Sequence, residues 1–143
     1  MNTKKALPEY VRVCLGATFL LGVLAHGMSL VNKFCLADEA ARMFTVGSTV
    51  ASGRWFLGVI GGFVRWFFGS PNFSLPLTGG LLTILLTGLC SCVLVSWMGL
   101  KKKISWILIS GLMITFPIMP CLFFYHFTAP YYMAGLLLIF LGG

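Results

Sequence analysis

The stretch PLTGGLLTILLTGLCSCVLVSWMGL, residues 76–100, runs for 25 residues without one charged side chain. A helix of about 20 mostly apolar residues is long enough to cross the hydrocarbon core of a membrane. Two further runs reach that length, at residues 13–31, where His26 is the only side chain that titrates near neutral pH, and at 104–125. A shorter apolar run occupies 131–143. We therefore predict an all-α integral membrane fold with three full transmembrane helices and an incomplete fourth.

The composition indicates the same class of protein. Charged residues make up 9% of the chain, against about a quarter in a typical soluble domain. The mean hydropathy is +0.98. No linker, internal repeat or low-complexity tract divides the sequence, so we predict a single membrane domain over residues 1–143.

The basic residues gather at the predicted membrane boundaries. A net charge of +7 would suit a protein that binds nucleic acid, but Lys4, Lys5 and Arg12 precede the first span, and Lys101–Lys103 lie between the second and third. Positive residues in short loops mark the cytoplasmic side of a membrane. We therefore predict a lipid bilayer and no nucleic acid as partner, a cytoplasmic N-terminus, and an outer location for residues 32–75.

Asp38 and Glu39 are the only acidic residues beyond the first ten positions. One interpretation is a helix start, with Asp38 paired to Arg42 one turn later. The other is a general base at the outer membrane face, where a carboxylate takes a proton from an attacking hydroxyl. The local sequence by itself favours the helix start. Arg54 also has two interpretations, contact with lipid headgroups or, with Arg42, paired hydrogen bonds to a lipid phosphate.

The outer segment also predicts two interfacial helices, at about 38–52 and 55–68, separated by a break at Ser52-Gly53. Trp55 and Trp66 are eleven residues apart and so fall on nearly the same face of the second helix. Aromatic residues at this spacing are typical of a helix that lies at the membrane surface.

Pro117 and Pro120 lie near the outer end of the third predicted span. A proline inside a membrane helix kinks it and frees backbone carbonyls, which neighbouring helices or a cavity must then receive. We therefore expect a kink in this span.

No residue pattern points to a metal or a cofactor. His26 and His126 lie on separate predicted elements, and Cys90 and Cys92 point to different faces of one helix. We predict no metal site, no cofactor and structural roles for all five cysteines.

Several short motifs follow one another in an order that is characteristic of one family. They are residues 32–39 (NKFCLADE), Gly47, residues 52–55 (SGRW), residues 115–117 (TFP) and residues 127–129 (FTA). In this order and membrane placement they resemble the bacterial Gtr-type glucosyltransferase II family, which modifies O-antigen and other surface polysaccharides. The resemblance covers nearly the whole chain, as the N-terminal portion of a longer multi-spanning enzyme.

The resemblance implies a GT-C type membrane glycosyltransferase of the bacterial cytoplasmic (inner) membrane, with its active-site loop on the outer face. Such an enzyme passes a glucosyl residue from a polyprenyl-phosphate donor to a polysaccharide or glycolipid acceptor. By this resemblance Asp38 is the candidate catalytic base, with Glu39 assisting. Arg54 is the candidate contact for the donor phosphate, together with Arg42. Neither a redox cofactor nor a metal is implied.

The chain departs from the family pattern at two points. Family members often carry an acid directly after Phe-Thr-Ala, where this sequence has Pro130, and they are much longer. Both departures keep a rival function open, that of a non-catalytic small membrane protein such as a carrier-lipid flippase component or a helper subunit.

Overall fold

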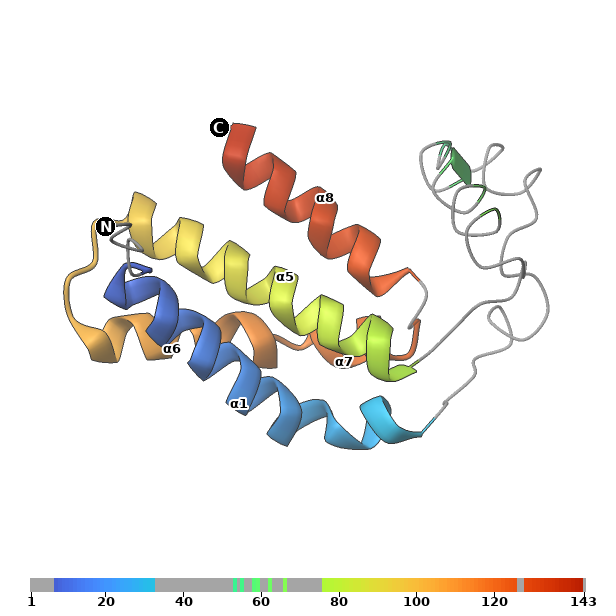
Figure 1. Ribbon diagram of the computed structural model, residues 1–143, viewed down its shortest axis with the longest axis horizontal. Coiled ribbons are helices and arrows are strands. Elements are labelled where there is room, and N and C mark those ends of the chain that lie inside the picture. Colours follow the sequence, from blue (N-terminus) through green and yellow to red (C-terminus); the bar gives the residue numbers. More distant parts are fainter. Residues whose placement is uncertain are drawn as a thin grey trace, which may run out of the picture.

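The computed structural model describes residues 7–32, 76–125 and 128–142, together with Gly53, Trp55, Gly58, Val59, Gly62 and Trp66. These residues form helices and turns and contain no strand (Figure 1). The helices are α1 (Glu9–Val31), α5 (Pro76–Trp97), α6 (Lys103–Thr115), α7 (Ile118–Phe123) and α8 (Ala129–Gly142). The all-α prediction is therefore confirmed for this part of the chain.

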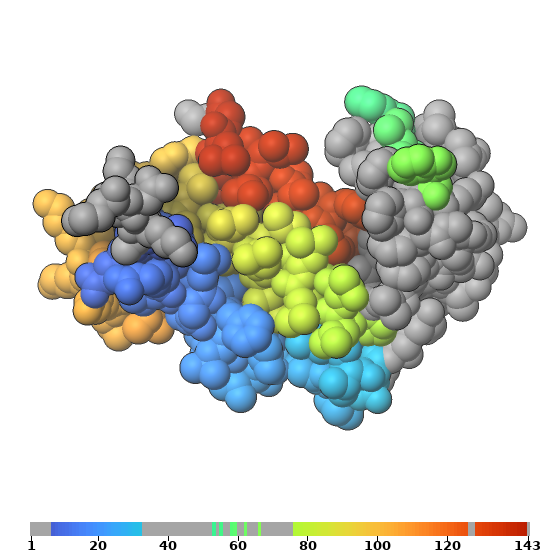
Figure 2. All heavy atoms as spheres, in the orientation of Figure 1, coloured from blue at the N-terminus to red at the C-terminus, as the bar shows by residue number. Residues whose placement is uncertain are grey.

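The long helices run back and forth along one bundle. Figure 1 shows α1 and α6 pointing one way and α5 and α8 pointing the other. Helix α1 packs against both α5 and α6, and α8 packs along α5 (Figure 2). We call the end formed by residues 9–12 and 97–103 the basic end, and the end formed by Asn32, Pro76, α7 and Ala129 the α7 end.

An ion pair joins two helix starts at the basic end. Lys103 Nζ, at the start of α6, lies 2.6 Å from Glu9 Oε1, at the start of α1. The start of α1 and the three-lysine loop therefore lie at the same end of the bundle, as their charge predicted.

A glycine-terminated turn reverses the chain at the basic end. Beyond the end of α5, the N–H of Gly99 donates to the carbonyl of Ser96, and that of Leu100 donates to Val95. Gly99 has a φ of +60°. This pair of bonds is the Schellman arrangement, whose left-handed residue is usually glycine. Trp106 Nε1 then donates to the Leu100 carbonyl at 2.7 Å and closes the loop against α6.

Within the described part of the chain, α1 and α5 are the two helices that are long and apolar enough to cross a membrane, with 23 and 22 residues. They contain the predicted spans 13–31 and most of 76–100. The predicted span 104–125 is divided between α6, of 13 residues, and α7, and α8 has 14 residues in place of the predicted 131–143. The number of three full spans and a partial fourth therefore stays a prediction.

The division between α6 and α7 has a local cause. Phe116 has a ψ of 139°, outside the helical range, and it directly precedes Pro117. The proline ring disfavours the helical conformation of the residue before it. The predicted kink is therefore a complete break in the helix.

Small and hydroxyl-bearing residues share the interior of the bundle with large apolar residues such as Ile84, Ile114 and Phe123, while many other large apolar side chains lie outside. Leu24 and Met28 on α1, Leu108 on α6 and Ile139 on α8 are 64–73% exposed. The buried hydroxyl residues are Thr18, Thr83, Thr87, Ser91, Ser110 and Thr128. Three hydroxyls on α5 bond carbonyls one turn earlier, Thr83 to Gly79, Thr87 to Thr83 and Ser91 to Thr87, at 2.8–3.0 Å. This distribution resembles the packing of membrane helices, which meet through small residues.

Glycine lets three helices meet at one point. A Cβ placed on Gly22 of α1 would lie 3.0 Å from Ile84 Cγ1 on α5 and 3.1 Å from Ile114 Cγ1 on α6. On α5, a Cβ on Gly80 would overlap the side chain of Leu30. The close approach of α1 to α5 and α6 therefore depends on the missing side chains at these positions.

The predicted interfacial helix at 38–52 lies outside the described residues. Of the second, at 55–68, the described positions Trp55, Gly58, Val59, Gly62 and Trp66 are each helical. Trp55 is 65% exposed and Trp66 is 78% exposed. Gly53 occupies a turn with a φ of +75°, at the predicted break.

Candidate functional site

A hydrogen bond joins α1 to the point where α6 breaks. The break leaves the last carbonyls of α6 without a following turn to bond them. His26 Nε2 lies 2.9 Å from the carbonyl oxygen of Ile114. Because a carbonyl only accepts, Nε2 carries the hydrogen of this bond. His26 is buried, and so an orphaned carbonyl of α6 receives its donor from α1.

An aromatic stack ties α7 to the same histidine. The rings of His26 and Phe123 are nearly parallel, with centroids 4.1 Å apart and planes 11° apart. Phe123 is 1% exposed, and its Cε1 would lie 3.3 Å from a Cβ on Gly80. Helix α7 is thereby packed against both α1 and α5, which positions its other face toward α8.

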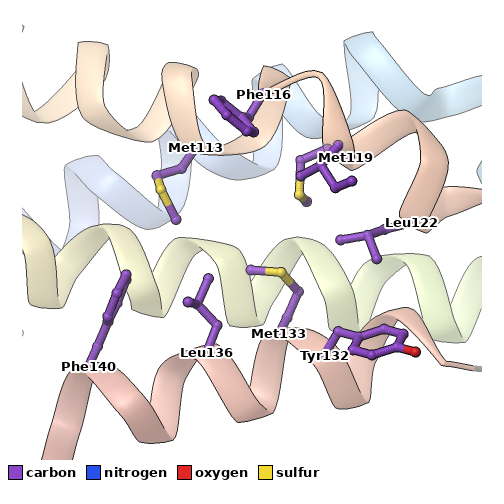
Figure 3. A pocket seen from close by; sticks show the side chains of 9 residues that line it. Met113, Phe116, Met119, Leu122, Tyr132, Met133, Leu136 and Phe140 are labelled. Carbon is purple, nitrogen blue, oxygen red and sulfur yellow. The ribbon is translucent and has the colours of Figure 1, made fainter. Parts of the chain in front are cut away.

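An apolar pocket of about 460 Å³ lies between that other face and α8 (Figure 3). Its two walls come from α6–α7 and from α8, and Figure 3 shows their side chains pointing toward one another. The lining residues are Met113, Phe116, Ile118, Met119, Leu122, Tyr132, Met133, Leu136 and Phe140.

The lining decides what the pocket can bind. None of these side chains is charged, and the Tyr132 hydroxyl is their single strong hydrogen-bonding group. Three methionines contribute flexible, polarizable surface that adapts to irregular apolar shapes. The pocket is therefore suited to hydrocarbon and lacks the groups that catalysis or phosphate binding would need.

The predicted catalytic and phosphate-binding residues lie outside the described residues. This applies to Asp38, Glu39, Arg42 and Arg54. In the sequence they lie between Asn32, which follows α1, and Pro76, which begins α5. Both of these positions belong to the α7 end (Figure 1). The structure therefore fixes the anchor points of this segment, and the roles of its residues remain predictions.

The described residues contain no group of three histidine, cysteine, aspartate or glutamate side chains that could hold a metal ion. His126, like Asp38 and Glu39, is outside that search. Cys14, Cys90 and Cys92 are buried between helices, and Cys121 is exposed on α7.

Sequence reasoning missed the part played by His26, which it considered only as a possible metal ligand. A signal for it was present, because Pro117 predicts freed carbonyls in the outer half of one span and His26 is a donor in the outer half of another. The apolar pocket had no such signal, since its methionines and aromatic residues are scattered from 113 to 140.

Comparison with known proteins identifies a family. The family model described as glucosyl transferase GtrII matches residues 27–142, which include the predicted site segment and all of α5 to α8. No curated protein and no solved structure matches the chain.

Proposed function

The chain belongs to the glucosyl transferase GtrII family, and from this membership we propose that it transfers a glucosyl residue from a polyprenyl-phosphate donor to a surface polysaccharide or glycolipid acceptor. The observation that carries the proposal is the extent of the match, residues 27–142. It spans the last residues of α1, all of α5 to α8 and the segment that holds Asp38 and Arg54.

The proposed setting is the bacterial cytoplasmic membrane, crossed several times. Two helices with the length and composition of membrane spans support it, as does the outward display of many large apolar side chains. The basic end would face the cytoplasm, following the positive-inside rule. The α7 end and residues 33–75 would then face outward, where the acceptor is.

In the proposed reaction the acceptor hydroxyl oxygen forms a bond to C1 of glucose while the bond from C1 to the phosphate oxygen breaks. Asp38 takes the hydroxyl proton, and Glu39 helps to position the acceptor. Polyprenyl phosphate leaves with the electron pair. Arg54, with Arg42, would bind the phosphate through paired hydrogen bonds, which an arginine fork makes well.

The test compares the acids of this chain, which has only three. Asp38→Asn removes the proposed base, and Glu9→Gln is the matched control because Glu9 lies at the basic end beside Lys103. With a polyprenyl-phosphate glucose donor and native membranes, we expect Asp38→Asn to lose about 100-fold or more of the transfer rate, the usual contribution of a general base. Glu9→Gln should transfer glucose normally.

Equal transfer by wild type and Asp38→Asn would rule out Asp38 as the base. An absence of transfer in the wild-type chain, with the donor supplied and the protein folded, would favour the non-catalytic function of a flippase component or helper subunit.

A further inference from the structure

All lysine, arginine, aspartate and glutamate side chains in the described part of the chain lie at the basic end of the bundle. They are Glu9 and Arg12 on α1, Lys101 and Lys102 in the loop between α5 and α6, and Lys103 at the start of α6. Figure 1 shows the start of α1 and this loop side by side. Four cations against one carboxylate give the basic end a net charge of +3.

Most of this positive charge is not neutralised within the bundle. Lys103 Nζ lies 2.6 Å from Glu9 Oε1, so these two charges offset one another. Arg12, Lys101 and Lys102 are exposed and make no ion pair within the described part of the chain. These three cations are therefore available to bind an anion from outside the protein.

Backbone hydrogen bonds fix the loop that carries Lys101 and Lys102. On one side of the pair, Trp106 Nε1 donates to the carbonyl of Leu100 at 2.7 Å. On the other side, the N–H groups of Ser105 and Trp106 donate to the carbonyl of Lys102 at 3.0 and 3.3 Å. A ligand that binds both lysines therefore has to order their side chains but not the loop, which lowers the entropic cost of binding.

Large apolar side chains lie on the surface beside these cations. Trp97, Met98 and Ile104 are 55–59% exposed. The ring of Trp97 also packs on Phe140 of α8, with centroids 5.8 Å apart. Exposed tryptophan next to basic residues at the end of an apolar helix is typical of the membrane–water interface. A ligand that matches the whole surface has an anionic group joined to hydrocarbon.

These two properties together select one class of ligand. A small soluble anion would pair with the lysines but would leave the apolar surface uncovered. A zwitterionic phospholipid would cover that surface, but its own cationic group would be repelled by the three cations. We propose that the basic end binds the headgroup of an anionic phospholipid through Arg12, Lys101 and Lys102, with the acyl chains against the neighbouring apolar surface. This binding does not depend on glucosyl transfer.

The first experiment titrates lipids against the wild-type chain in detergent and counts bound molecules by native mass spectrometry. The probes are phosphatidylglycerol and phosphatidylethanolamine with identical acyl chains. We expect the first phosphatidylglycerol to bind at least about tenfold more tightly, with a preference that shrinks as salt screens the exposed charges. Equal binding of the two lipids would overturn the proposal. So would displacement of phosphatidylglycerol by an equal concentration of inorganic phosphate, because the ligand would then be the anion alone.

The second experiment changes the charge of the basic end in both directions. Replacing Lys101 and Lys102 together with Gln removes two cations, and replacing both with Arg is the matched control that keeps them. At about fivefold for each charge, we expect the Gln protein to bind phosphatidylglycerol roughly 25-fold more weakly. The Arg protein should bind it at least as tightly as wild type.

The opposite change removes the one carboxylate of the basic end. Glu9→Gln releases Lys103 from its ion pair and should strengthen the binding of phosphatidylglycerol by about fivefold. Equal weakening by the Gln and Arg pairs, or weaker binding by Glu9→Gln, would show that charge does not select the lipid and would overturn the proposal. If the Gln pair does not fold, Glu9→Gln and the lipid preference of the wild-type chain decide it.

Discussion

His26 on α1 and Ile114 on α6 are joined by a hydrogen bond of 2.9 Å, although 88 positions separate them in the sequence. The same imidazole stacks on Phe123 of α7. One buried side chain thus contacts both halves of the broken helix. The break near Pro117 is therefore tied to a particular partner helix, and this makes α7 part of the bundle.

Replacing His26 with Phe should separate the hydrogen bond from the ring stack. The phenyl ring can still pack on Phe123, but it leaves the buried Ile114 carbonyl without its donor. We expect a loss of about 1–3 kcal/mol in the free energy of unfolding, the usual cost of an orphaned buried polar group. Leu24→Ala, on the same helix and 73% exposed, should change stability by less than about 0.5 kcal/mol. Unfolding in mild detergent measures the free energy of unfolding of both variants. Equal stability of His26→Phe and wild type would contradict the assigned hydrogen bond.

Gly22→Ala should destabilise the bundle, whereas Gly27→Ala should not. The new methyl group at position 22 would meet Ile84 and Ile114 at 3.0–3.1 Å, and the one at position 27 meets nothing within 4 Å. Overpacking costs about 1–3 kcal/mol, offset in part by the helix preference of alanine, which is worth up to about 1 kcal/mol. At position 27 the new methyl group causes no overpacking, so only the helix preference of alanine acts and the variant should be as stable as wild type or slightly more stable. Thermal unfolding of the two variants in one detergent gives the comparison, and a Gly22→Ala protein as stable as Gly27→Ala would refute the close approach.

Two buried threonines should respond to valine in opposite directions. Thr18 Oγ1 is buried and has no hydrogen-bond partner within the described part of the chain, whereas Thr87 Oγ1 donates to the Thr83 carbonyl at 2.8 Å. Thr18→Val removes an unsatisfied hydroxyl and should raise the free energy of unfolding by about 1–3 kcal/mol. Thr87→Val removes a bond and should lower it by about 0.5–1.5 kcal/mol. Chemical denaturation of both variants shows whether each substitution raises or lowers the free energy of unfolding. A stabilised Thr87→Val variant would be inconsistent with the hydrogen bond from Thr87 to the Thr83 carbonyl.

The proposed orientation predicts which cysteines react from outside intact cells. In a Cys121→Ser background, Cys35 should react with an impermeant maleimide without permeabilisation. With Cys35 also replaced by Ser, Lys102→Cys should react only after permeabilisation, because Glu9 and Lys103 place the lysine loop beside the start of α1 at the basic end. The reverse labelling pattern would invert the proposed topology.

The positions of the helices were accessible from sequence because hydropathy is a property of one segment at a time. The uncharged run from Pro76 and the run ending at Val31 each form one long helix, as predicted. The prolines at 117 and 120 indicated a distortion, and the common end of Lys103 and the first span followed from charge. The family motifs were readable in the same way, and the match over residues 27–142 confirms the family that they indicated.

The tertiary structure decided the features that depend on how the helices rotate and approach one another, namely the partner of His26 and the apolar pocket. The length of α6 follows locally from the break before Pro117, whereas the acceptor of His26 follows from the depth at which α1 crosses that break. The apolar pocket exists because α8 packs along α5 while Phe123 holds α7 against α1, which leaves methionine and aromatic side chains facing across a gap. The histidine contact and the pocket depend on contacts between residues far apart in the chain. Local composition determines where a helix forms, whereas the partner of a freed carbonyl and the shape of a pocket are set only when several helices pack together.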